Sequence, residues 1–272
     1  MLQRVVVDPC QICLKAIALT QDQQHYLGRV LRLQAGDRFI AMDGQGQSWL
    51  AHLIVLEDQL QAEIVEPMQT HTELPIRVTL VMALPKGNGF DDVVRQATEL
   101  GVACIVPVLG DRTLLKPSPQ KCDRWRRIAQ EAAEQSERQY VPILQDPIPF
   151  TQSLTHLTPD HNYLCITRHT APHLLNCLLS PTSCPISYGD ATRTPLAPCL
   201  TLAIGCEGGW TDTEVEQAIA AGYQPVSLGS RILRAVTAPI VALSLIAAVY
   251  EKNGDRESSS GGVAHVEIPK FE

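Results

Sequence analysis

The sequence predicts an α/β protein in which a small β domain precedes a larger domain built on a parallel sheet. Between residues 38 and 66, apolar and polar residues alternate across short turn signals, which is typical of antiparallel strands with one buried face. After Pro75 the pattern changes, and continuous apolar runs alternate with helical segments. Such runs are typical of parallel strands that are buried on both faces. The length of 272 residues is suited to about two domains.

The expected boundaries follow from shifts in composition along the chain. We assign residues 1–73 to the β domain and residues 75–252 to the α/β domain. Residues 67–75 are polar, have a proline at each end and lack periodicity, so we interpret them as a linker. Residues 180–198 have the composition of a surface loop, and we expect residues 253–272 to form a partly disordered tail.

Helix boundaries are marked by capping residues. The expected starts and ends are Thr20 with Gln23, Ser118 with Pro119, and Thr211 with Glu214, then Gly101 and Gly222. A last helix is expected over residues 238–250, where an almost wholly apolar run indicates burial in a core or at a subunit interface. The run is shorter than the ~20 residues that a membrane span needs, so no membrane association is expected.

Composition argues against several functional classes. The formal net charge of -7 disfavours a protein that binds nucleic acid through bulk charge, although it is compatible with a local basic patch. Nine cysteines without a visible secretory leader indicate free thiols in a reducing cytoplasm. Cys10 and Cys13 form a CxxC pair without a second pair at zinc-site spacing, so no metal is expected. The motifs of hydrolases and metalloenzymes are missing from the sequence.

A glycine-rich loop, LAIGCEGGWTDTE at residues 202–214, stands between an expected buried strand and an expected helix. Glycines at such a turn let the backbone approach a bound molecule closely. Their spacing matches neither the dinucleotide-binding fingerprint nor the P-loop. Glu207 is the one charged side chain before the helix start. Two interpretations stand at this point: a site that holds a small cofactor through its main chain, and a tight turn that needs glycines for steric reasons.

A second candidate stretch, SLGSRILRAVTAP at residues 227–239, follows another expected strand. Arg231 and Arg234 are three residues apart, so they share a face if the segment is helical. The planar set of donors in arginine suits phosphate and carbonyl oxygens. The alternative interpretation is an ion pair or a solvated helix start.

Basic residues in two other segments are compatible with RNA binding. Arg127 and Arg138 recur at near-helical spacing around Trp125, while Arg29 and Arg32 lie in the β domain. A solvated amphipathic face, whose charge is diluted by neighbouring glutamates, explains the first group equally well.

Five stretches, in this order, resemble the ribosomal RNA methyltransferase family often called RsmE. They are HYLGRVLRLQAGD, ATELGVACIVPVLGDR, WRRIAQEAAEQSERQYVP, LAIGCEGGWTDTE and LGSRILRAVTA, within a resemblance that spans residues 1–250. Five collinear motifs are far more specific than any one of them. The resemblance implies an enzyme that methylates N3 of a uridine in the 16S RNA of the small ribosomal subunit.

This family belongs to the SPOUT class, which implies further expectations for the fold and the partners. The parallel-sheet domain would form a trefoil knot, and the first domain would be a PUA-like β-barrel that binds RNA. S-adenosylmethionine would be the methyl donor and S-adenosylhomocysteine the product. Family members are homodimers through the knotted domain, and the apolar run at residues 238–250 is suited to that contact.

The resemblance also implies site residues, carried over by position. The cofactor pocket would be lined by Thr167, Ile204, Gly205, Gly208, Gly209, Leu228, Gly229, Ile232 and Leu233. The catalytic residues would be Arg231 and Arg234, which stabilise an anion, and Glu207, which accepts a proton or only orders its loop. RNA contacts would come from Arg29, Arg32, Arg112, Arg127 and Arg138.

Three departures from the family pattern leave other functions open. Cys206 stands where the family usually has Pro, and Ala235 and Val236 stand where it usually has Thr-Glu. Gln96 stands where Lys is frequent. The missing carboxylate at Val236 is the reason for weighing a non-catalytic RNA-binding relative. The other alternative is a different SPOUT enzyme that methylates a base or a ribose of transfer RNA.

Overall fold

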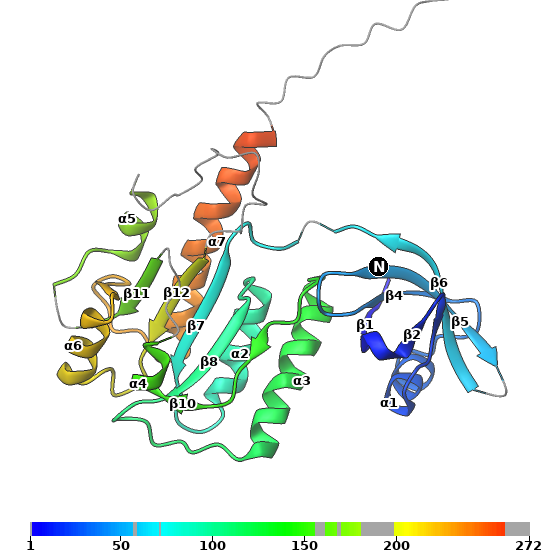
Figure 1. Ribbon diagram of the computed structural model, residues 1–272, viewed down its shortest axis with the longest axis horizontal. Helices are drawn as coiled ribbons and strands as arrows, with labels where there is room; N and C mark the ends of the chain where they lie inside the picture. Colours follow the sequence, from blue (N-terminus) through cyan, green and yellow to red (C-terminus); the bar gives the residue numbers. More distant parts are fainter. Residues whose placement is uncertain are drawn as a thin grey trace, which may run out of the picture.

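The computed structural model describes residues 2–56, 59–70, 72–155, 161–167, 170–180 and 199–258. Figure 1 shows two domains, with the first domain at one end and the α/β domain, which carries the long helix α7 (Thr237–Ser258), at the other. The site depends on how the strands of the second domain are ordered.

The first domain is a six-stranded mixed sheet. Its strands are β1 (Arg4–Val6), β2 (Ile12–Cys13), β3 (Ala16–Ile17), β4 (Arg38–Met42), β5 (Ser48–Leu56) and β6 (Gln59–Met68), in the order β1-β4-β5-β6-β3-β2. The antiparallel pairing of β4, β5 and β6 confirms the prediction from the alternating residues. β1 pairs with β4 in parallel, which the alternation did not reveal.

A short helical segment packs into the core of this domain. The helical elements are the 3-10 turn η1 (Pro9–Gln11), the α-helix α1 (Gln21–His25) and the π-helical η2 (Tyr26–Val30). Thr20 Oγ1 accepts the backbone N–H of Gln23, and Gln23 Oε1 accepts that of Thr20, so the predicted capping box is confirmed. Leu27 of η2 is fully buried among apolar side chains of the sheet.

The strand pairs that the structure describes in the second domain are all parallel, as predicted. The sheet has the order β10-β8-β7-β12-β11-β13, with β9 beside β8. Its strands are β7 (Arg77–Ala83), β8 (Cys104–Leu109), β9 (Ile143–Leu144), β10 (Ile148–Pro149), β11 (His161–Cys165), β12 (Cys199–Ile204) and β13 (Gln224–Val226). Its helices, besides α7, are α2 (Gly89–Glu99), α3 (Pro119–Gln135), α4 (Phe150–Ser153), α5 (Leu174–Leu179) and α6 (Asp212–Ala220).

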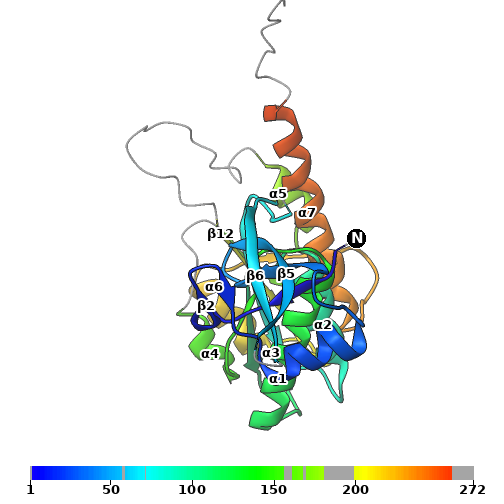
Figure 2. The ribbon, with the colours of Figure 1, turned by 90° about the vertical axis from the view of Figure 1, so that its right-hand side faces the viewer.

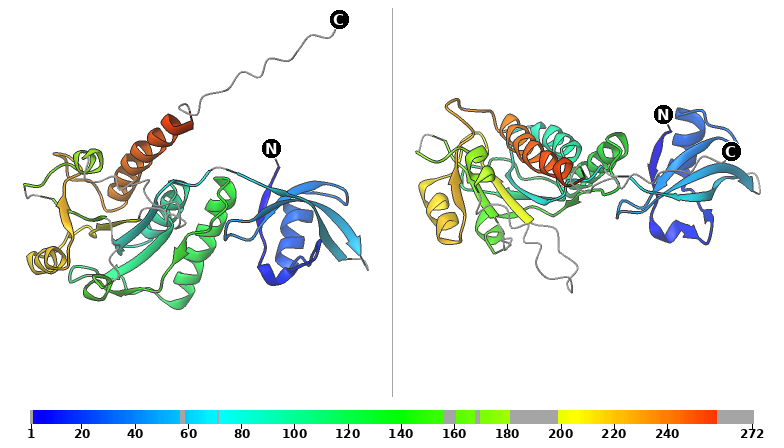
Figure 3. Two further views of the ribbon diagram at one scale, coloured as in Figure 1. Left: turned by 45° about the horizontal axis from the view of Figure 1, so that its top comes forward. Right: turned by 90° about the horizontal axis from the view of Figure 1, so that it is seen from above.

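Helices cover both faces of this sheet. On one face, α2, α3, α5 and α7 enclose the larger core, which contains the fully buried Trp125. Figure 3 shows α2 between α7 and α3 on that side of the sheet. α4 and α6 cover the other face, where Phe150 stacks on Trp210. Because both faces are covered, a small ligand reaches this sheet at the ends of its strands.

The strand order reverses in the middle of the sheet. The chain moves outward from β7 through β8 to β10, then crosses to the other side of β7, where β12 lies between β7 and β11. β11, β12 and β13 run parallel to one another, so the loops that follow them share one edge. In open parallel sheets, ligands bind at the carboxyl edge near such a reversal.

Helix ends follow their predicted signals. Ser118 Oγ accepts the backbone N–H of Lys121 at the start of α3. Gly101 and Gly222 come just after α2 and α6 and have φ angles of +85° and +102°. Glycine adopts this left-handed conformation without strain, which makes it a common last residue of a helix cap.

The C-terminal helix is longer than expected. The backbone of α7 extends to Ser258, past the boundary predicted at residue 252. Residues 259–272 of the expected tail lie outside the described residues, as do residues 181–198 of the expected surface loop.

Arg138 is buried just after the end of α3, which corrects its predicted role in RNA binding. Its side chain is only 3% exposed. Nη1 donates to the carbonyl oxygens of Thr98 and Val102 at 3.0 and 2.8 Å, and Nη2 donates to Glu73 at 2.7 Å. The near-helical spacing in the sequence identified the charge of Arg138. It could not identify these acceptors, which come from distant parts of the chain. The segment predicted as a linker therefore ends in an ordered, charged contact.

The carboxylate of Glu73 also lies at the contact between the two domains. It accepts the backbone N–H of Gln139 at 3.0 Å. The carbonyl of Gln139 accepts the N–H of Gly46, and the N–H of Val141 donates to Gly44, so this segment pairs with a turn of the first domain. Figure 2 views the first domain in front of α2 and α3. The two domains are thus joined through backbone hydrogen bonds beside the end of α3.

Glu73→Ala is expected to lower the free energy of unfolding by about 3 kcal/mol, because it leaves the buried Arg138 without its charged partner. Urea denaturation followed by circular dichroism measures the change. Asp146→Ala is the matched control, since its ion pair with Arg126 is largely exposed and such pairs contribute under about 1 kcal/mol. Equal effects of the two substitutions would contradict the role assigned to Glu73.

Candidate functional site

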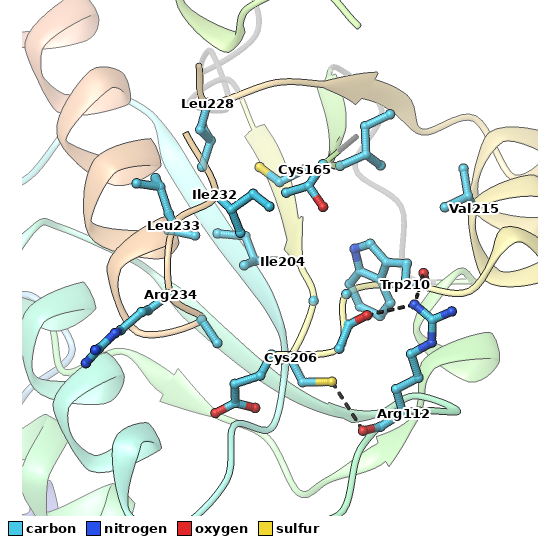
Figure 4. Close-up of a pocket in the computed structure, with 18 of the residues that line it drawn as sticks. Arg112, Cys165, Ile204, Cys206, Trp210, Val215, Leu228, Ile232, Leu233 and Arg234 are labelled. Atoms are coloured by element: carbon cyan, nitrogen blue, oxygen red, sulfur yellow. Dashed lines mark hydrogen bonds between the residues drawn. The ribbon is translucent and has the colours of Figure 1, made fainter. Parts of the chain in front are cut away.

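A pocket of about 500 Å³ lies at the carboxyl edge of the sheet, between the loops that follow β11, β12 and β13 (Figure 4). The cofactor residues implied by the resemblance all line it, and they are Thr167, Ile204, Gly205, Gly208, Gly209, Leu228, Gly229, Ile232 and Leu233. The expected catalytic residues Glu207, Arg231 and Arg234 line it as well. Motifs that are distant in the sequence therefore meet at one place, and the volume suits a small molecule.

The wall that follows β12 is a tight turn of backbone. Gly209 N donates to Cys206 O at 2.9 Å, and Gly209 has a φ angle of +67°. A Cβ atom on Gly205 would lie 3.2 Å from the backbone of Gly209, which is closer than packed Cβ atoms normally come. A Cβ atom on Gly209 would meet nothing within 4 Å, so that side of the turn is open. One glycine serves close packing and another leaves the backbone accessible.

Arg112 fixes the shape of this turn, a role that the sequence did not reveal. Its Nη1 donates to Gly208 O at 2.7 Å and to Trp210 O at 3.0 Å. The thiol of Cys206 lies 3.4 Å from the carbonyl oxygen of Arg112. The loop after β8 therefore holds the loop after β12 in place. The Arg112 side chain is also exposed, and its contact with RNA stays a prediction.

Glu214 strengthens the same connection at the start of α6. It is buried, and its Oε1 accepts the backbone N–H of Asp111 at 2.9 Å. Its Oε2 accepts the N–H of Thr211 at 2.7 Å, while Thr211 Oγ1 accepts the N–H of Glu214 at 3.2 Å, so the predicted capping box is confirmed. Both carboxylate oxygens accept hydrogen bonds from backbone donors, so Glu214 supports the pocket wall without lining the pocket.

The opposite wall is the irregular segment between β13 and α7. Gly229 has a φ angle of +114°, and its N–H donates to Ser227 Oγ at 3.1 Å. Leu228 and Leu233 are half-buried, whereas Ile232 is 66% exposed. The apolar side chains of this segment line the pocket opposite the glycine-rich wall.

Arg231 and Arg234 lie in this irregular segment and not on a helix, because α7 begins only at Thr237. The two arginines were expected to share a face only if this segment is helical, and it is not. Both side chains are exposed. In Figure 4, Arg234 extends away from Trp210 on the side where α7 begins. The two arginines thus occupy the rim of the pocket.

Val236 makes an apolar contact at the position where the resemblance leads us to expect a carboxylate. Its Cγ1 atom lies 2.8 Å from the place that a Cβ atom on Gly89 would take, so the side chain packs closely against the start of α2. Val in place of the usual Glu therefore replaces a charged group with an apolar contact to the start of α2.

The carboxylate of Glu207 connects the glycine turn to the loop after β7. Its two oxygens lie 3.0 and 3.3 Å from the backbone N–H donor of Lys86. The Glu207 residue is exposed at the rim of the pocket. This contact supports a role in ordering the loop, and the role as proton acceptor stays a prediction.

The remaining expected RNA contacts lie outside the pocket. Arg29 and Arg32 are exposed in and just after η2, and Arg127 is exposed on α3. Arg32 has a φ angle of +59°, which is uncommon for a residue other than glycine. All three guanidinium groups are accessible to a nucleic-acid backbone, and their role stays a prediction.

Sequence reasoning missed several residues that line the pocket, namely Cys165, Ile166, Cys206, Trp210, Asp212, Val215, Ala235 and Ala238. Trp210 and Asp212 stood within the glycine-rich motif, which therefore carried a signal for them. Cys165 ends β11, Ile166 follows it directly and Val215 lies on α6, and in the sequence all three look like ordinary core residues.

Metal and membrane sites are not found in the part of the chain that the structure describes. No group of His, Cys, Asp or Glu side chains there is arranged to bind a metal ion. No helix among these residues has both the length and the apolar character needed to cross a bilayer. Cys10 and Cys13 are exposed free thiols.

Known proteins share this fold and these motifs. A family model described as an RNA methyltransferase domain matches residues 72–247, and one described as an RNA methyltransferase PUA domain matches residues 19–65. A Synechocystis protein named ribosomal RNA small subunit methyltransferase E is 47% identical over 92% of this chain and 79% of its own length. The chain belongs to the ribosomal RNA small subunit methyltransferase E family.

Other members of the methyltransferase E family cover most of the chain as well. The Bacillus subtilis protein is 31% identical over 84% of this chain and 88% of its own length. The crystal structure of the Neisseria gonorrhoeae protein, bound to S-adenosyl methionine, is 27% identical with a TM-score of 0.77. It covers 92% of this chain and 98% of its own. These matches confirm the family resemblance and the order of a PUA domain before an α/β methyltransferase domain.

Cys165 is expected to resist alkylation although it lines the pocket. Burial raises the pKa of its thiol to about 12, so the reactive thiolate is scarce at pH 8. Iodoacetamide treatment at pH 8 followed by peptide mass spectrometry should modify the exposed Cys13 and spare Cys165. Rapid modification of Cys165 in the folded protein would contradict the burial of its thiol.

Proposed function

We propose that this chain transfers a methyl group from S-adenosylmethionine to N3 of a uridine in the 16S RNA of the small ribosomal subunit. The observation that carries this proposal is the meeting of two glycine-bearing segments, residues 205–209 and 228–233, at one pocket in a chain of this family. The Neisseria relative, which was crystallised with S-adenosyl methionine, supports the choice of cofactor.

The pocket residues fit this cofactor. The open side of Gly209 offers backbone groups to a neutral adenine or ribose without a charged side chain. Ile204, Leu228 and Leu233 add apolar surface on both walls. When bound, S-adenosylmethionine supplies an electrophilic methyl group on sulfur and leaves as S-adenosylhomocysteine. Residues 204–209 and 228–233 would hold it, and close positioning of the two reactants is itself a large part of catalysis.

The arginines at the rim would prepare the uracil for reaction. N3 of uracil carries a proton at neutral pH and is a poor nucleophile until that proton leaves. The resulting anion is spread over N3 and the two flanking carbonyl oxygens, and fixed donors aimed at developing charge stabilise it. Arg231 and Arg234 are exposed at the rim and can supply such donors.

A carboxylate at the pocket would accept the proton from N3. Glu207 and Asp212 both line the pocket. We assign the role to Glu207, which lies in the glycine turn itself. Its hydrogen bond from Lys86 N would keep the carboxylate in one orientation, so ordering the loop and accepting the proton are compatible.

RNA binding and assembly complete the proposal. Arg29 and Arg32 of the PUA-like domain, with Arg127 of α3, would contact phosphates of the substrate. The segment after β13 would be threaded into a trefoil knot, and two copies would associate through this domain with help from the apolar α7. The enzyme would act in the cytoplasm, where its ribosomal substrate is found.

Nucleoside mass spectrometry tests the proposed activity. Small-subunit RNA from cells that lack this protein should lose 3-methyluridine, and adding the purified enzyme with S-adenosylmethionine should restore it. Bulk transfer RNA treated in the same way should gain no methyl group. Methylation of transfer RNA in place of small-subunit RNA would favour a different SPOUT enzyme and would contradict the proposal.

Arg112→Ala is expected to weaken S-adenosylmethionine binding roughly tenfold, because the Gly208 and Trp210 carbonyls lose a charged donor that fixes the turn. Isothermal titration calorimetry measures the affinity. Arg127→Ala is the control, since Arg127 lies outside the pocket and should leave cofactor affinity unchanged. If the two variants bind the cofactor equally well, Arg112 does not shape the turn.

Arg234→Ala is expected to reduce turnover roughly a hundredfold, because a donor to the developing anion is lost. The dissociation constant for S-adenosylmethionine should change less than about threefold, since backbone groups provide most of that binding. Single-turnover kinetics on isolated small subunits, together with calorimetry, separate the two quantities. Parallel losses in turnover and cofactor affinity would assign Arg234 to the cofactor instead of the uracil.

A further inference from the structure

Trp210 presents an unpaired donor at the wall of the pocket. Its side chain is only 8% exposed, and its ring stacks on Phe150 with centroids 4.2 Å apart. The buried indole N–H finds no hydrogen-bond partner within the described part of the chain. By contrast, the fully buried Trp125 donates its indole N–H to Asp91 at 2.9 Å. Buried N–H groups are normally paired, because leaving one unpaired costs free energy.

The orientation of this indole is held from three sides. Its Cζ3 atom lies 3.5 Å from the place that a Cβ atom on Gly110 would take, so this edge of the ring packs on the loop after β8. Arg112 holds the carbonyl of Trp210, and Phe150 covers one face of the ring. The nitrogen lies on the opposite edge of an indole from Cζ3. In Figure 4 it points into the pocket, on the side of Cys165 and Ile204.

We propose that the indole N–H of Trp210 donates a hydrogen bond to a ring nitrogen of the adenine of S-adenosylmethionine. This inference rests on the proposed function. Trp210 would be a binding residue that selects the base of the cofactor.

The chemistry of the two ends of the pocket favours the adenine as the acceptor. Around Trp210 the wall includes Cys165, Ile166 and Val215, which suit a flat, uncharged base. The exposed Arg231 and Arg234 line the other wall, whereas Arg112 at this end already donates to the Gly208 and Trp210 carbonyls. The methyl group must face Arg231 and Arg234 if it is to meet the uracil. Adenine carries three ring nitrogens, N1, N3 and N7, that accept hydrogen bonds. The methionine carboxylate also accepts hydrogen bonds, but its charge makes it less suited to an apolar wall.

Calorimetry with altered ligands and altered protein tests this pairing. The ligands are S-adenosylmethionine, S-adenosylhomocysteine and three forms of the latter in which N1, N3 or N7 is replaced by C–H. The proteins are the wild type, Trp210→Phe and the control Trp49→Phe. Trp49 is half-buried on β5 in the first domain and does not line the pocket. Circular dichroism confirms that each variant is folded.

Trp210→Phe should weaken binding of both natural ligands about fivefold, as expected for loss of one hydrogen bond, while Trp49→Phe should not. One of the three altered ligands should bind the wild type about fivefold more weakly than S-adenosylhomocysteine does. That difference should disappear in Trp210→Phe, because the donor is already absent. This loss of coupling separates a hydrogen bond from a general packing defect, which would weaken all ligands equally.

Two results would overturn the inference in different ways. In the first, the wild type binds the natural ligands, and every altered ligand has the same affinity relative to S-adenosylhomocysteine in Trp210→Phe as in the wild type. The indole then does not contact the base, and the proposed function is untouched. If the wild type binds neither natural ligand, the proposed function fails together with the inference.

Discussion

The pocket depends on the close packing of the glycine turn after β12. Gly205 lies so near the backbone of Gly209 that a Cβ atom there would push the turn apart by a few tenths of an ångström. The turn is then held from outside by Arg112, which donates to two of its carbonyls, and by Glu214, which binds backbone donors of both adjoining loops. Side chains thus shape the loop, while its open backbone faces the cavity. The uncharged adenine and ribose of a cofactor can be recognised in this way without a charged residue in contact with them.

The order of the strands explains why the segment after β13 lies opposite the glycine turn after β12. β12 is inserted between β7 and β11, and β13 lies on the far side of β11. The loops that follow these strands therefore open on the same edge, although residues 205 and 229 belong to different strand–loop units. The first domain is joined to this framework through backbone hydrogen bonds beside the end of α3. These hydrogen bonds would fix the distance between the pocket and any residues of the first domain that contact RNA.

Local features of the fold could be predicted from the sequence because they depend on neighbouring residues. The capping boxes at Thr20 and Thr211 and the glycine after α2 are examples, since each needs only a few adjacent positions. The pocket residues came from the family motifs. Arg138 was assigned wrongly and the role of Arg112 was missed, because their partners lie 36 to 98 residues away along the chain. Periodicity also says nothing about strand order, so neither the parallel β1 nor the insertion of β12 could be predicted.

The segments at 205–209 and 228–233 are expected to enclose the methyl donor. A crystal structure of the protein with S-adenosylmethionine tests it most directly. Electron density for the donor is expected between the two segments, with its methyl group toward Arg231 and Arg234. Density for the donor at another place on the molecule would contradict the account.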